Sequence, residues 1–147
     1  FILIGGALLF AYVLTYGKIP QAFAGLIIGA NLSPVAFLFG TLVMLGLMGC
    51  VLDAAPIIFI TLPVMWPAAI ELGIDPTHMA VFMLIAIIAG QATPPVGINL
   101  FAMSALTKER IEDVAVGAVP FFAAEYLAMI VILLVPAFST WLPGLMG

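Results

Sequence analysis

The sequence predicts an all-α integral membrane protein whose helices are interrupted inside the bilayer. Composition is the first observation, because 66% of the 147 residues are hydrophobic and 7% are charged, against about a quarter charged in a typical soluble domain. The second is the length of the apolar stretches, which suits helices that cross or enter a bilayer. The third is a pair of adjacent prolines, Pro94 and Pro95, within the apolar run from Met79 to Leu106. Such a pair predicts a broken helix.

Charge and side-chain chemistry exclude several classes of function. The net charge of −4 is unsuited to nucleic acid, which favours a basic face. Cys50 is the only cysteine, so this chain cannot build a disulfide or a thiolate metal site. An intramembrane hydrolase needs a nucleophile with a base, or a pair of acids. Asp53 and Glu125 are the only deep acids and no histidine accompanies them, so we expect no enzyme activity.

Residues 1–33 are expected to form the end of one transmembrane helix and a short interfacial helix. The chain begins inside an apolar run without a leader or cleavage site, so we expect a C-terminal piece of a longer protein. The first helix covers Phe1–Tyr16 and ends over Gly17–Pro20. The next apolar segment, Gln21–Asn31, would be about 16 Å long at 1.5 Å per residue, too short to span a bilayer.

Residues 34–72 are predicted to form a re-entrant hairpin. Pro34–Leu72 is nearly uncharged, too long for one span and too short for two spans with a polar turn. The tip should fall where small and polar residues gather, between Gly46 and Pro56. Pro63 and Pro67 are expected to bend the returning helix. A single long, tilted, proline-kinked helix remains the alternative.

Residues 73–106 are predicted to form the broken transmembrane helix. Asp75 suits the N-cap and Pro76 the first helical position, and His78 in the first turn is most simply an interfacial residue. The helix should run to Gly90 and resume at Gly97, where glycine lets the chain turn back into a helix.

Two carbonyl groups should lose their helical partners at this break. Pro94 and Pro95 have no N–H to donate, which frees the oxygens of Gly90 and Gln91. Non-helical backbone at membrane depth is tolerated only inside protein or beside a cavity, so the break is either a packed defect or a site.

The remaining residues are expected to form a polar loop, 107–113, and a final transmembrane helix within 114–147. Lys108 and Arg110 lie in the loop, and the positive-inside rule places it in the cytoplasm. The helix should run from Val114 to about Leu142 with a bend at Pro136. Glu125 lies within this helix and matches no motif, so a functional role and a contact with another subunit remain equally open.

The two ends of a broken helix attract opposite charges. The half-helix ending at Gly90 presents carbonyl oxygens and the negative end of its dipole, which suit Na⁺, and Thr93 can add an oxygen. The half-helix starting near Gly97 presents N–H groups and a positive end, which suit a carboxylate. One break can therefore bind both partners of a symport.

Four sequence blocks together resemble the large membrane subunit of tripartite ATP-independent periplasmic (TRAP) transporters. In chain order they are Gly-Cys-Val-Leu-Asp at Gly49–Asp53, Leu-Pro-Val-Met-Trp-Pro at Leu62–Pro67, Gly-Ile-Asp-Pro at Gly73–Pro76 and Thr-Pro-Pro-Val-Gly-Ile-Asn-Leu-Phe at Thr93–Phe101. The resemblance covers essentially the whole chain. It implies the second of two inverted repeats in an elevator-type secondary transporter. Residues 1–33 would then supply a scaffold helix and an arm helix, and residues 34–106 a moving transport domain.

The resemblance also implies the site residues. Na⁺ would be bound by Gly49, Gly90, Thr93 and Val96, mostly through backbone oxygens. Asp53 is interpreted as a tip-stabilising or substrate-side residue, against a simple cap of the returning helix. Asn99 and Gly97, at the second half-helix, are further candidates for a substrate-side or tip-stabilising role. For Asn99, capping of the break is favoured over contact with substrate.

The implied function is Na⁺-coupled uptake of a small organic acid, such as a C4-dicarboxylate or sialic acid. A periplasmic substrate-binding protein would deliver the acid, and a small membrane subunit, separate or fused, would complete the scaffold. The expected location is the inner membrane of a bacterium or archaeon, as a multi-pass protein surrounded by lipid. We expect no cofactor beyond Na⁺ as the coupling ion and no metal other than Na⁺. A membrane channel or a structural assembly subunit is the alternative.

Overall fold

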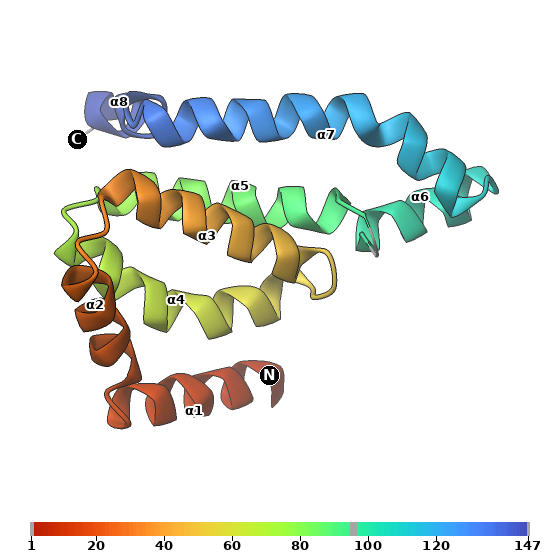
Figure 1. The fold of residues 1–147 in the computed structure, drawn as a ribbon. Helices are drawn as coiled ribbons and strands as arrows, with labels where there is room; N and C mark the ends of the chain where they lie inside the picture. Colours follow the sequence, from red (N-terminus) through yellow and green to blue (C-terminus); the bar gives the residue numbers. More distant parts are fainter. Residues whose placement is uncertain (1, 95–96, 147) are drawn as a thin grey trace.

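The computed structural model describes residues 2–94 and 97–146, and these form helices joined by short turns (Figure 1). The helices are α1 (Ile2–Tyr16), α2 (Ile19–Gly29), α3 (Pro34–Gly49), α4 (Ala54–Glu71), α5 (Pro76–Ala92), α6 (Ile98–Thr107), α7 (Ile111–Leu134) and α8 (Ala137–Met146). No strand occurs in the described ranges, so the predicted all-α class is confirmed there. By length and composition, α4 and α7 qualify as membrane spans.

The turn between α1 and α2 is shorter than predicted. Only Gly17 and Lys18 separate the two helices, because Pro20 lies in the first turn of α2, where a missing N–H costs no helical hydrogen bond. The prediction that Gly17–Pro20 lies between helices is therefore wrong for its last two residues. Figure 1 shows α2 running at a steep angle to α1, and α2 packs on α4.

Residues 34–71 form a helical hairpin. Ser33 is the N-cap of α3 and accepts a hydrogen bond from the N–H of Ala36 at 3.2 Å. The chain reverses over residues 50–53, and α4 then continues through Pro63 and Pro67. The alternative of one long kinked helix is wrong. Figure 1 places the tip of the hairpin partway along the line of α5 and α6, beside the gap between them.

The predicted helix break lies between α5 and α6. Asp75 caps α5 by accepting a hydrogen bond from the N–H of His78 at 3.0 Å, as expected. Helix α5 ends at Ala92, two residues beyond the predicted end at Gly90, and α6 begins at Ile98. Pro95 and Val96 lie outside the described residues. Because α6 continues roughly along the line of α5, the pair reaches further than either helix alone (Figure 1).

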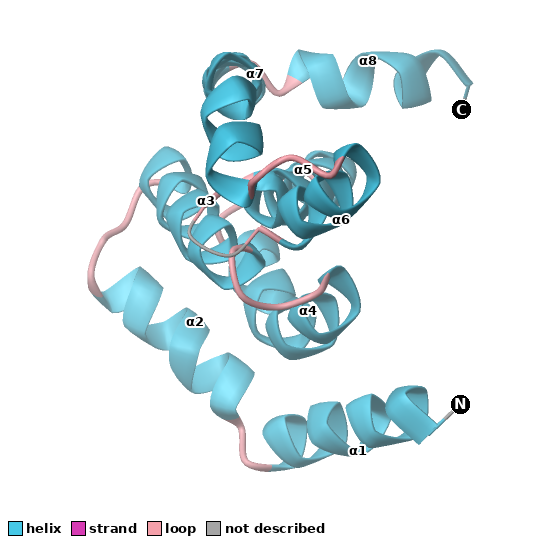
Figure 2. Cartoon of the chain, turned by 90° about the vertical axis from the view of Figure 1, so that its right-hand side faces the viewer, coloured by secondary structure: helices cyan, strands magenta, loops and turns pink. Residues whose placement is uncertain are grey.

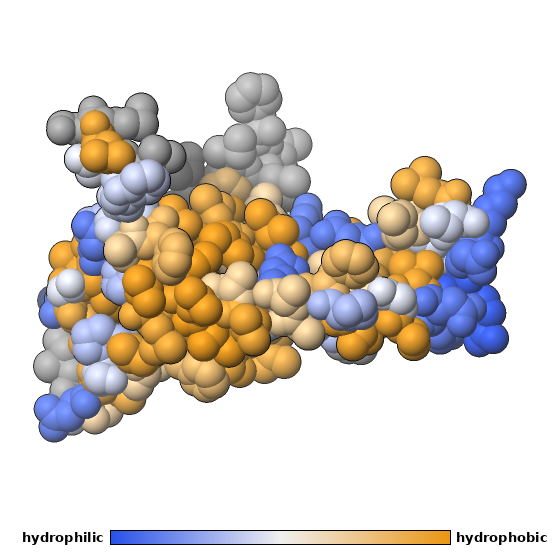
Figure 3. All heavy atoms as spheres, turned by 90° about the horizontal axis from the view of Figure 1, so that it is seen from above, coloured by the Kyte–Doolittle hydropathy of each residue, from blue (hydrophilic) through white to orange (hydrophobic). Residues whose placement is uncertain are grey.

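The polar turn between α6 and α7 contains only residues 108–110, and not 107–113 as predicted. Glu112 and Asp113 lie in the first turn of α7, where the positive end of the helix dipole stabilises acids. Figure 1 shows this turn at the opposite end of the molecule from the α1–α2 and α4–α5 turns. In Figure 3 the same end is hydrophilic, whereas the middle of the surface is mostly apolar.

The prediction of one bent C-terminal helix is wrong. Helix α7 ends at Leu134, and α8 leaves it at a wide angle after Pro136 (Figure 2). A hydrogen bond of 3.1 Å joins Ser139 Oγ in α8 to His78 Nδ1 in the first turn of α5. His78 is only 2% exposed, so it is a packed residue that holds α8 on α5.

Candidate functional site

The hairpin tip and the helix break meet through two glycines whose backbones touch. A Cβ added to Gly49 would lie 2.7 Å from the Cα of Gly90, and one added to Gly90 would lie 2.8 Å from the Cα of Gly49. Real Cβ atoms do not approach other atoms this closely, so the observed packing of α3 on α5 requires glycine at both positions. Gly49 and Gly90 lie 41 positions apart in the sequence. The prediction assigned both to one site, and the structure brings them together.

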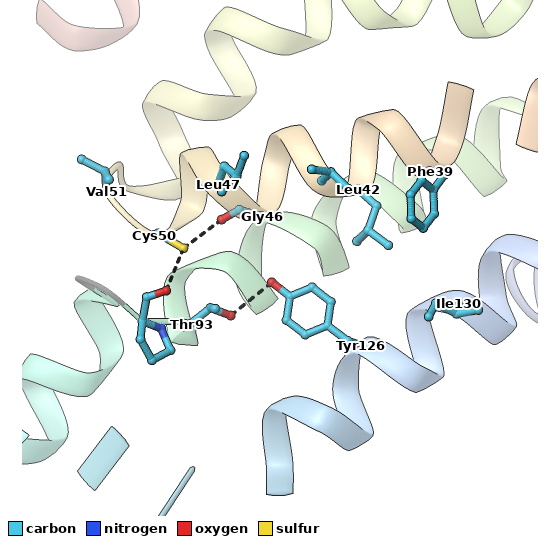
Figure 4. Close-up of a pocket in the computed structure, with 11 residues that line it drawn as sticks. Phe39, Leu42, Gly46, Leu47, Cys50, Val51, Thr93, Tyr126 and Ile130 are labelled. Carbon is cyan, nitrogen blue, oxygen red and sulfur yellow. Dashed lines mark hydrogen bonds between the residues drawn. The ribbon is translucent and has the colours of Figure 1, made fainter. Parts of the chain in front are cut away.

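Backbone and thiol hydrogen bonds join the tip to the far side of the break. The N–H of Gly97 donates to the carbonyl oxygen of Cys50 at 3.1 Å. The Cys50 Sγ–H lies 3.2 Å from the oxygen of Gly46 and 3.4 Å from that of Pro94 (Figure 4). Gly97 has φ +54°, the left-handed conformation that glycine adopts at little cost. Its predicted role in returning the chain to a helix is confirmed.

Asp53 caps the returning helix and also bonds to the end of α5. Its Oδ1 accepts hydrogen bonds from the N–H of Ala54 and from Gln91 Nε2, both at 2.7 Å. The first bond caps α4, and the second ties the hairpin tip to the last turn of α5. Gln91 was not predicted as a partner, because 38 residues separate it from Asp53.

Thr93 is the C-cap residue of α5, and it contacts a residue that sequence reasoning missed. Its Oγ1 lies 2.7 Å from the oxygen of Ala89 and 3.1 Å from Tyr126 Oη on α7 (Figure 4). Nothing in the sequence marked Tyr126, since it stands in an apolar helix without a motif around it.

A groove of about 480 Å³ opens beside these two hydroxyl groups. Its walls come from α3, the hairpin tip, the residues that follow α5, and α7. Figure 4 shows Thr93 and Tyr126 facing each other across one side. The lining is apolar apart from the hydroxyl groups and the backbone. Its residues are Phe39, Leu42, Val43, Gly46, Leu47, Cys50, Val51, Thr93, Pro94, Tyr126 and Ile130.

The predicted free carbonyl groups are only partly free. The oxygen of Gly90 accepts the N–H of Thr93 at 3.0 Å, so the expectation that proline leaves it unpaired is wrong. A carbonyl oxygen has two lone pairs, so one remains. The oxygens of Gln91 and Gly49 accept no hydrogen bond within residues 2–94 and 97–146. Val96, the fourth predicted ligand, lies outside these ranges.

The first turn of α6 keeps unpaired N–H groups. The N–H of Gly97 is used by Cys50, whereas those of Ile98 and Asn99 have no partner in the described part of the chain. The side chain of Asn99 is exposed and makes no hydrogen bond there, so the favoured capping role finds no contact to support it.

Asp53 supplies a carboxylate at this junction, where it bonds to Ala54 and Gln91. No group of three or more histidine, cysteine, aspartate or glutamate residues gathers anywhere in the described ranges. Besides the Asp53 carboxylate, the oxygens near the ends of α3 and α5 are those of backbone and hydroxyl groups. Glu125 is half-buried on α7 and makes no ion pair or hydrogen bond with a described residue.

Comparison with known proteins gives one consistent result. The family model described as "Tripartite ATP-independent periplasmic transporter, DctM component" matches residues 1–138. The C4-dicarboxylate TRAP transporter large permease protein DctM of Vibrio cholerae is 36% identical over 98% of this chain and 32% of its own length. The protein of the same name in Pseudomonas aeruginosa is 37% identical over 99% of the chain and 34% of its own length.

A third relative, the isethionate TRAP transporter permease protein DctMQ of Oleidesulfovibrio alaskensis, is 28% identical over 97% of the chain and 22% of its own length. The chain thus spans about a third or less of these relatives. They are named as transporter permeases and not as enzymes, in agreement with the prediction. The chain belongs to the DctM component family of tripartite ATP-independent periplasmic transporters.

Proposed function

We propose that the chain forms part of the large membrane subunit of a Na⁺-coupled transporter that takes up a small organic acid. The observation that supports this most is the meeting of four helix ends at one junction. Helices α3 and α5 end there and α4 and α6 begin there, and the Gly49–Gly90 contact holds them together.

A cation is favoured where α3 and α5 end. The C-terminus of a helix carries the negative end of its dipole, and two such ends lie side by side here. The oxygens of Gly49 and Gln91 are unpaired within the described residues, and Thr93 adds a hydroxyl oxygen. Unwound backbone carbonyls and half-helix C-termini are the groups that bind Na⁺ in secondary transporters.

An anion is favoured where α6 begins. Of the two helix N-termini at the junction, α4 is already capped by the carboxylate of Asp53, whereas α6 follows Gly97 and has no side-chain cap. The N–H groups of Ile98 and Asn99 are unpaired within the described residues, and such groups suit a carboxylate. Two of the most similar relatives are named for C4-dicarboxylates, so we propose that class as the substrate.

The proposed assembly follows the family. A periplasmic binding protein would deliver the acid, and a small membrane subunit would complete the complex in the inner membrane. Helix α3 has 16 residues and is about 24 Å long at 1.5 Å per residue, less than the roughly 30 Å of a bilayer core. This length and the position of the tip support a hairpin that enters and leaves on one side. The second inverted repeat and the elevator motion of α3–α6 belong to the same proposal.

Uptake of a labelled C4-dicarboxylate tests the proposal. The complete transporter would be reconstituted in liposomes with its binding protein, and Na⁺ would be replaced by choline. We expect uptake to be lost without Na⁺. Thr93→Val should raise the half-saturating Na⁺ concentration about tenfold, the effect of losing one polar contact to a charged group.

Thr93→Ser is the matched control, because it keeps the hydroxyl oxygen, and it should stay close to the wild type. Uptake that continues unchanged in choline would disprove Na⁺ coupling. Ungated flux of the acid in both directions would instead support the channel alternative.

A further inference from the structure

Helix α7 brings a hydroxyl group to the junction. Tyr126 Oη lies 3.1 Å from Thr93 Oγ1, and a Cβ added to Gly46 would lie 3.2 Å from the same hydroxyl oxygen. Tyr126 therefore contacts α3 and α5 at once, close to the ends that form the proposed cation site (Figure 4). No other described residue is hydrogen-bonded to the Thr93 hydroxyl apart from Ala89.

Proton counting assigns the donor in the Thr93–Tyr126 pair. Thr93 has one hydroxyl hydrogen, and the 2.7 Å distance to the Ala89 oxygen places that hydrogen in a bond to Ala89, since a carbonyl oxygen cannot donate. Tyr126 must then donate its own O–H to Thr93 Oγ1. A hydroxyl oxygen has two lone pairs, so Thr93 keeps one for another partner.

We propose that Tyr126 is a positioning residue of the Na⁺ site. Its O–H group occupies one lone pair of Thr93 Oγ1 and holds that side chain between α5 and α7, so that a single lone pair faces the ion. This inference rests on the proposed Na⁺-coupled function and extends it to α7. Tyr126 acts through Thr93 and is not itself a ligand.

The test measures the Na⁺ dependence of uptake in the reconstituted transporter. Tyr126→Phe removes one oxygen and leaves the ring in place. We expect the half-saturating Na⁺ concentration to rise about 2- to 10-fold, the range of one neutral hydrogen bond, with the loss of uptake at low Na⁺ reversed by raising Na⁺. Tyr16→Phe is the matched control, because Tyr16 lies on α1 with 82% of its surface exposed, and it should leave the Na⁺ dependence unchanged.

Double variants show whether Tyr126 works through Thr93. In a Thr93→Ser background, Tyr126→Phe should produce its usual shift, because serine keeps the hydroxyl that accepts the bond. In a Thr93→Val background, it should add no shift. If the Thr93→Val protein is not assembled, Thr93→Ala takes its place, because alanine also lacks the hydroxyl that accepts the bond.

Three results would overturn the inference while leaving Na⁺ coupling intact. They are an unchanged or lower half-saturating Na⁺ concentration in Tyr126→Phe, a lower maximal uptake without any shift, and an equal shift in the Thr93→Val background. If uptake by the wild-type transporter does not depend on Na⁺, the proposed function is disproved, and the role of Tyr126 with it. The wild-type and variant measurements thus separate the two failures.

Discussion

Proline interrupts the helical chain at two places, and the two breaks are held in different ways. At Pro94, backbone groups and glycines hold the ends, through the Gly49–Gly90 contact and the bond from Gly97 to Cys50. At Pro136, one buried side-chain pair holds α8 on α5. Helix α6 continues roughly along the line of α5, whereas α8 turns away from α7 (Figures 1 and 2). The first break leaves helix ends available for ligands, and the second changes the direction of the chain.

Four other prolines show that proline alone does not break a helix. Pro63 and Pro67 lie inside α4, Pro120 lies inside α7, and Pro143 lies inside α8. Each removes one backbone hydrogen bond, yet the helix continues. The helices stop two residues before Pro94 and Pro136, where groups from distant parts of the chain hold the residues beyond the proline.

The largest effect is expected from filling the glycine contact of the first break. Gly49→Ala and Gly90→Ala should each destabilise the protein by about 1–3 kcal/mol through overpacking and reduce uptake more than tenfold. Gly40→Ala is the control, because Gly40 is also on α3 but has open space around it. It should be neutral or stabilising, since alanine favours helix by about 1 kcal/mol. Thermal unfolding and uptake measure both effects, and equal stability of Gly49→Ala and Gly40→Ala would refute the contact.

A smaller effect is expected where the chain re-enters the helix. Gly97 and Gly73 both have positive φ, +54° and +72°, so alanine costs about 1–2 kcal/mol at either position. A Cβ at Gly97 would also lie 2.9 Å from Leu100 Cδ1, whereas Gly73 has open space. Thermal unfolding should therefore show a larger loss for Gly97→Ala, with lower uptake. Equal losses would mean that backbone conformation alone requires glycine at Gly97.

Weakening the contact at the second break should lower the stability of the protein without changing the Na⁺ dependence of uptake. Ser139→Ala leaves His78 Nδ1 without its partner, and His78 Nε2 already lacks one among the described residues. An unsatisfied buried polar group costs about 1–3 kcal/mol. Thr140→Ala is the control, because Thr140 Oγ1 bonds only to the nearby oxygen of Pro136. Limited proteolysis of α8 and thermal unfolding should separate the two variants, and a shift in Na⁺ half-saturation with Ser139→Ala would show that the breaks are coupled.

Local chemistry was sufficient to predict much of the fold. Composition predicts an all-α membrane protein, Asp75 and Pro76 mark the start of α5, and the tandem prolines mark the break before α6. The four sequence blocks identify the family, and the pairing of Gly49 with Gly90 follows from that resemblance. These features depend on residues near one another in the chain or on motifs that local sequence preserves. Na⁺ and substrate binding at these residues remain predictions.

Only the tertiary structure decided which distant side chains meet. Thr93 and Tyr126 are 33 residues apart, Asp53 and Gln91 are 38 apart, and His78 and Ser139 are 61 apart. Helical periodicity relates residues three or four positions apart, so it contains no information about such pairs. The same limit explains why one bent C-terminal helix was predicted where α8 turns away. A proline frees a carbonyl group wherever it stands, but the packing of other helices determines whether the chain bends, breaks or continues.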